Sequence, residues 1–70
     1  MRDNLDLAAS AQQLADAAPA GSLDRAAAAS VAITLATTRD VFQARQTLDG
    51  LAPQDVRQAA LTLFEELSES

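Results

Sequence analysis

The side chains that could take part in chemistry in this sequence are carboxylates and hydroxyls. The chain has no histidine and no cysteine, so the commonest general base and the usual ligands of transition metals are missing. Asp3 with Asp6, and Glu65 with Glu69, have the spacing at which two carboxylates on one helix could share a cation. Neither pair belongs to a loop dense in oxygen ligands, and each is typical of a helix end in solvent. We therefore expect no bound metal and no cofactor.

Hydroxyl side chains cluster near the middle of the chain, at Ser30, Thr34, Thr37 and Thr38. A serine or threonine nucleophile needs a neighbouring base, and without histidine or lysine only a carboxylate could serve. Within a helix, such a hydroxyl usually donates to a carbonyl one turn earlier. The two glycines are isolated, which leaves no glycine-rich loop for a phosphate. We expect no catalytic residue, no small-molecule substrate and no enzymatic activity.

The charge balance argues against nucleic acids and anionic membranes as partners. Ten acidic residues oppose five arginines, which gives a net charge of −5, whereas binding to a phosphate backbone needs a basic surface. The segment from Leu48 to Phe64 has the order of a helix-turn-helix, but its second helix carries one basic residue, Arg57. Such a helix would repel phosphate, so we expect no direct contact with nucleic acid.

From the sequence we expect no targeting segment and no membrane span. The longest uncharged run near the middle, residues 26–38, has 13 residues and is mostly Ala, Thr and Ser, whereas a span needs about 20 strongly apolar residues. We expect a cytoplasmic protein. Arginine supplies every basic residue and alanine is abundant, which indicates a bacterial genome of high GC content.

The elements that would position these side chains are all helical. The pattern predicts one all-α domain over residues 1–70, a helical hairpin followed by a third, amphipathic helix. Asp3 or Asn4 could cap the first helix and Ser22 the second. Gly50 is expected in the left-handed conformation after the second helix, and Pro53 at the start of the third. The predicted helices cover residues 4–18, 23–49 and 53–67.

The middle helix is the element whose assignment leaves alternatives open. Its apolar positions, among them Val31, Leu35 and Phe42, form a broad sector that could pack on two sides. Residues 31–38, VAITLATT, also alternate as a β-strand would, but no second strand is evident and we favour a helix. A break near Thr37–Thr38 is the other alternative, with Thr37 capping a new helix and Asp40 as its acidic partner.

Seventy residues form a small core, so a lone chain is expected to leave apolar helix surface uncovered. We expect a non-catalytic protein–protein interaction module that forms a helical-bundle homodimer, binds another protein, or does both. Phe42 and Phe64 are the only aromatic residues and the largest potential anchors, although plain core packing would also explain them. The candidate interface residues are Val31, Leu35, Phe42, Val56, Leu61, Phe64 and Leu67.

The alternative function is that of a small acidic regulatory inhibitor, antitoxin-like or of a phage type, that occupies a basic site on a target protein. Glu65, Glu66 and Glu69 lie near the end of the third helix and could steer a basic surface toward it. Carboxylates at such positions also serve solubility, which leaves that simpler interpretation open.

Overall fold

The computed structural model describes residues 3–69, and within that range it contains four α-helices and no β-strand. The helices are α1 (Asn4–Ala17), α2 (Leu23–Thr37), α3 (Val41–Asp49) and α4 (Gln54–Glu69). The prediction of an all-helical chain is confirmed. The prediction of three helices is wrong, because the expected helix over residues 23–49 is two helices.

The break between α2 and α3 has a local cause in the sequence around Thr38 and Asp40. The Thr38 hydroxyl donates to the Thr34 carbonyl at 2.7 Å, and Thr38 itself leaves the helix with an extended backbone. Asp40 is also extended, and its carboxylate accepts from the backbone N–H of Gln43 at 2.8 Å. Asp40 therefore caps α3 directly. The alternative of a break at this place is confirmed, although the cap is Asp40 and not Thr37.

Side-chain caps also set the beginnings of the first two helices. The Asp3 carboxylate accepts from the backbone N–H of Asp6 at 2.9 Å, and the Ser22 hydroxyl accepts from that of Arg25 at 3.1 Å. Each satisfies a donor that the first helical turn leaves without a partner. Both caps are at positions where the sequence predicts them.

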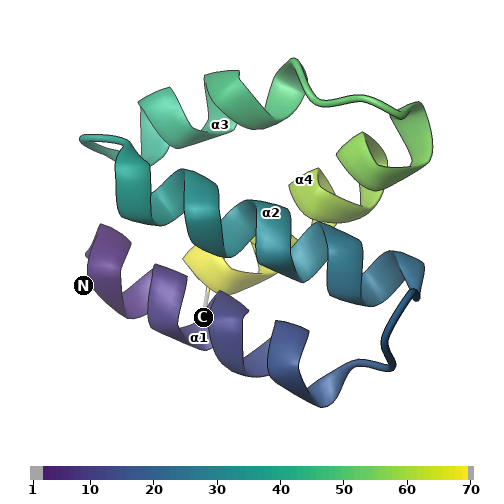
Figure 1. The fold of residues 1–70 in the computed structure, drawn as a ribbon. Helices are drawn as coiled ribbons and strands as arrows, with labels where there is room; N and C mark the ends of the chain where they lie inside the picture. The colour runs from purple at the N-terminus through teal and green to yellow at the C-terminus, as the bar shows by residue number, and fades with distance from the viewer. Residues whose placement is uncertain (1–2, 70) are drawn as a thin grey trace.

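The helices α1, α3 and α4 surround α2, which contacts all three. Figure 1 shows α1 and α3 on opposite sides of α2, with α4 crossing behind. The Asn4 side-chain amide donates to the Thr38 carbonyl at 3.3 Å, so the start of α1 lies beside the end of α2 and the two helices are antiparallel. This pair forms a helical hairpin, with a second helix that ends at Thr37 and not at residue 49 as predicted.

The core combines a few large side chains with many alanines. Leu7, Val31, Leu35 and Leu48 are the largest side chains that are fully buried, and Phe64 is 5% exposed. Alanines fill much of the remaining core and allow helix backbones to approach closely. The buried alanines in this cluster are Ala8, Ala11, Ala27, Ala32, Ala44 and Ala60.

The left-handed glycine of the described chain is Gly21 and not, as predicted, Gly50. Gly21, in the connection between α1 and α2, has a φ of +81°, in the region that favours glycine. Gly50, at the end of α3, has a φ of −94°, so the prediction of a left-handed residue there is wrong. The backbone N–H of Gly50 still donates to the Thr47 carbonyl at 3.1 Å, which closes the last turn without a positive φ.

Among residues 3–69, no helix has the length and apolar character that crossing a bilayer requires.

Candidate functional site

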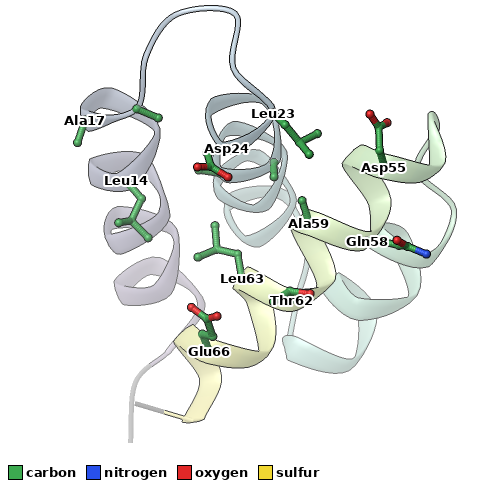
Figure 2. A pocket seen from close by; sticks show the side chains of 13 residues that line it. Leu14, Ala17, Leu23, Asp24, Asp55, Gln58, Ala59, Thr62, Leu63 and Glu66 are labelled. Atoms are coloured by element: carbon green, nitrogen blue, oxygen red, sulfur yellow. The ribbon is translucent and has the colours of Figure 1, made fainter.

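An apolar groove lies where α1, α2 and α4 meet. Its volume is about 620 Å³, and its apolar walls come from Leu14 on α1, Leu23 and Ala27 on α2, and Ala59 and Leu63 on α4. Figure 2 shows Leu14 and Leu63 pointing toward each other across the groove. We call this surface the α1–α4 groove.

The α1–α4 groove exists because α1 and α4 each pack on α2 far more than on each other. Five alanines are among the residues that line the space between them, and their side chains are too short to fill it. Leu14 and Leu23 consequently remain 45% and 42% exposed. A volume of this size lies within the range of sites that hold a ligand or a partner's side chain.

Every charged residue that lines the α1–α4 groove is a carboxylate: Asp24, Asp55 and Glu66. In Figure 2, Asp24 and Glu66 lie on either side of the Leu14–Leu63 pair, and Asp55 lies farther away at the start of α4. None of the arginines among residues 3–69 lines the groove. The groove therefore combines an apolar floor with a negative rim.

A second exposed apolar feature is the side chain of Phe42, at the second position of α3. It is 79% exposed, although it belongs to the apolar row that the sequence predicts. The break at residues 38–40 explains this difference. A new helix begins at Val41 with its own orientation, and it turns Ala44 and Leu48 into the core instead.

The other candidate interface residues lie within the fold of one chain. Val31, Leu35 and Phe64 are in the core, at 0%, 1% and 5% exposure. Leu61 and Leu67 are partly buried against that core, and Val56 is half-buried. The structure thus buries three of the seven candidates, partly buries three more and leaves Phe42 exposed.

The three glutamates of α4 do not act as one patch. The Glu65 carboxylate pairs with the Arg45 guanidinium of α3 at 3.3 Å, and each side chain is 53% exposed. Glu66 faces the α1–α4 groove, and Glu69 is exposed at the end of α4. Of the three, only Glu66 contributes to the rim of the groove.

The sequence prediction missed Leu14, Leu23, Leu63 and Asp24 as site residues. Leu14 and Leu63 lie at the helical spacing of an apolar face, and Asp24 lies in the first turn after the Ser22 cap. The missing information was how far α1 and α4 lie apart, which no single helix pattern contains. The one local signal in the sequence was a leucine at the first position of a helix, Leu23, directly after its cap.

The hydroxyl cluster is engaged with the backbone. Ser30 donates to the Ala26 carbonyl at 2.9 Å, and Thr37 to the Ile33 carbonyl at 2.8 Å. The hydroxyls of the helical segment thus satisfy carbonyls one turn earlier. Within the described part of the chain, no group of three carboxylates is arranged to hold a metal ion.

Comparison of the chain with protein-family models, with curated proteins and with solved structures found no match.

Proposed function

We propose that this protein is a non-catalytic protein–protein interaction module whose docking surface is the α1–α4 groove. The observation that supports this is the groove itself: three helices present Leu14, Leu23 and Leu63 around an open apolar space of about 620 Å³. Covering such side chains releases water from apolar surface. A helix that lays its apolar face into a groove is a common mode of recognition. The proposal keeps the cytoplasmic location expected from the sequence, which fractionation of cells carrying a tagged chain tests.

The negative rim defines the chemistry of the proposed partner segment. Asp24 and Glu66 lie beside the apolar floor, so a helix with arginine or lysine next to its apolar stripe would place opposite charges together. Such charge pairs mainly increase the association rate and the specificity.

The direct test uses a labelled amphipathic helical peptide made of leucine and lysine as the probe. Its affinity is measured by fluorescence anisotropy for the wild type and for the double variant Leu14→Gln, Leu23→Gln. Because both leucines are half-exposed, the double variant should keep its fold, which circular dichroism checks. We expect its affinity to fall by about tenfold or more, since the apolar wall supplies the contact.

The matched control is the double variant Leu5→Gln, Ile33→Gln. These side chains are 71% and 64% exposed and do not line the groove, so peptide affinity should stay at the wild-type level. Equal affinities for all three proteins, or no binding at all, would contradict the proposal.

A second candidate function is the small acidic inhibitor that occupies a basic site. The observation that favours it is the placement of Glu66 at the rim of the groove and of Glu69 one turn later on α4. In that case the carboxylates would carry the binding. Glu66→Arg would then abolish binding to the basic peptide, whereas Leu14→Gln with Leu23→Gln would leave it nearly unchanged. The opposite ranking would support the interaction module.

A further inference from the structure

Phe42 is the most exposed of the large apolar side chains in the described chain, at 79%. Two arginines flank it in the sequence, Arg39 three residues before it and Arg45 one helical turn after it, and the Asp40 carboxylate between Arg39 and Phe42 is hydrogen-bonded as the α3 cap. Residues three apart on a helix lie on the same face, so Phe42 and Arg45 share one face of α3. Both arginines are exposed. The start of α3 therefore exposes an aromatic side chain that has an arginine on either side of it in the sequence.

The ion pair of Arg45 with Glu65 leaves the Arg45 guanidinium available to a carboxylate of another molecule. Arg45 and Glu65 are 3.3 Å apart and each is 53% exposed, and ion pairs this accessible to solvent contribute little stability. Arg45 can exchange Glu65 for another carboxylate at small cost. In the α3 cap, the backbone N–H of Arg39 donates to Gln43 Oε1 at 2.9 Å. The Arg39 guanidinium takes no part in this cap.

We propose that the occupant of the α1–α4 groove is the start of α3 from a second copy of this chain. The Phe42 ring of one copy enters the groove of the other, between Leu14 and Leu63. Its Arg39 and Arg45 then face Asp24 and Glu66 at the rim. This inference rests on the proposed function of the groove and names the partner that fills it. Aromatic side chains in well-packed pockets are the usual anchors of such contacts.

The arrangement of α2 makes this contact intermolecular. The groove lies at the first residues of α2, Leu23–Ala28, while Phe42 follows its last residue, Thr37. Fifteen helical residues span about 22 Å, and Figure 1 shows these two ends of α2 on opposite sides of the molecule. A chain therefore cannot place its own Phe42 in its own groove.

Charge distinguishes this contact from the two symmetrical alternatives. Pairing two grooves would bring Asp24 and Glu66 of both copies together, and pairing two Phe42 surfaces would bring four arginines together. Like charges placed against each other disfavour such complexes. Of the three pairings, only the groove with Phe42 joins an apolar floor to an apolar side chain and a negative rim to positive neighbours.

The test is sedimentation of purified chain over a concentration series, followed by a mixing experiment. The wild type should show an average mass that rises above the 7.3 kDa of one chain. Phe42→Gln alone, and Leu14→Gln with Leu23→Gln, should each stay at the mass of one chain, because each removes one half of the contact. An equimolar mixture of these two variants should associate again, since one supplies an intact groove and the other an intact Phe42.

Two controls keep the interpretation specific. Ile33→Gln removes another exposed apolar side chain, 64% exposed on α2, and should associate as the wild type does. Glu66→Arg tests the rim without touching the apolar walls and should weaken association by about tenfold, whereas Glu69→Arg, outside the groove, should not. This charge variant also replaces the leucine double variant if circular dichroism shows the latter to be unfolded.

Three results would overturn the inference. One is a wild type that keeps the mass of a single chain up to about 1 mM, the weak end of measurable affinities. Another is a variant mixture that stays monomeric, and the third is loss of association in Ile33→Gln. If any of these occurs while the leucine–lysine peptide still binds at Leu14 and Leu23, the groove remains a docking surface and its occupant is a different protein. If the peptide does not bind either, the proposed function fails as well.

Discussion

The Asp40 side chain determines where α3 begins, after α2 has ended at Thr37. Its carboxylate accepts from the backbone N–H of Gln43 at 2.8 Å, and the Gln43 side chain in turn accepts from the backbone N–H of Arg39 at 2.9 Å. This pair of bonds stabilises the first turn of α3 and holds the chain away from the direction of α2. The exposure of Phe42, two residues later, follows from that change of direction.

The cap predicts a measurable loss of stability for Asp40→Ala. Removing an aspartate N-cap costs about 1 kcal/mol of unfolding free energy, and urea denaturation followed by circular dichroism measures it. Asp49→Ala is the control at the other end of α3, where the helix dipole disfavours a carboxylate. That variant should be unchanged or slightly more stable, and a loss equal to that of Asp40→Ala would show that the cap has no special role.

At the scale of elements, the connections determine how the four helices can be placed. The link between α1 and α2 passes through Gly21 with a φ of +81°, and no atom lies within 4 Å of the position where a Cβ would be. The constraint at Gly21 is therefore conformational and not steric. At Gly50 the φ is negative, and an added Cβ would be 3.6 Å from the Thr47 carbonyl oxygen, which is an ordinary contact.

The two glycines consequently predict opposite effects of the same substitution. Gly21→Ala should lower the unfolding free energy by about 1–2 kcal/mol, because an L-residue disfavours this region. Gly50→Ala should be neutral or raise it by about 0.4–1 kcal/mol, since the unfolded chain loses freedom and the folded chain gains no strain. Thermal melts of both variants beside the wild type test this, and the reverse order would contradict the assignment.

Local rules in the sequence predict the helices well and their relative placement poorly. Asp3 and Ser22 cap where the pattern indicates, because capping depends only on residues within one turn. The prediction of one continuous helix over residues 23–49 was wrong. The apolar spacing continues past Thr38 and Asp40, but the hydroxyl of Thr38 and the carboxylate of Asp40 hydrogen-bond to backbone groups and interrupt the helix. Gly50 was misassigned for a related reason: glycine permits a positive φ without requiring one.

The candidate site depended on information that no single helix contains. Phe42 was selected as an anchor from a row that the break interrupts, so it is exposed for a reason that the prediction did not include. Leu14 and Leu63 lie on the expected apolar faces, yet the groove between them depends on the distance between α1 and α4. The choice between a core role and a surface role for a leucine is decided by tertiary packing.

At the scale of the whole molecule, one chain builds a core around α2, and among residues 3–69 five large apolar side chains are still exposed: Leu5, Leu14, Leu23, Ile33 and Phe42. These five side chains are the apolar surface that the lone chain leaves uncovered. Val31, Leu35 and Phe64, which were also expected at an interface, are buried within the chain itself. Folding thus depends on the buried residues, whereas the association proposed above depends on exposed ones.

That separation predicts different outcomes for a buried and an exposed aliphatic residue on α2. Leu35→Ala, at 1% exposure, should lower the unfolding free energy by about 2–5 kcal/mol because it leaves a cavity. Ile33→Ala, at 64% exposure, should change it by less than about 0.5 kcal/mol. Urea titrations at low protein concentration measure both. Similar losses for the two variants would contradict a buried position for Leu35 and an exposed position for Ile33.

The alanine-rich core has a consequence for how the protein responds to temperature. An alanine exposes little apolar area when it leaves the core, and newly hydrated apolar area is the main source of the heat-capacity increment of unfolding. A domain packed around Ala11, Ala27, Ala32, Ala44 and Ala60 should therefore have a small increment for its length. Its stability curve should then be flat, so that its stability varies little between cold and warm conditions.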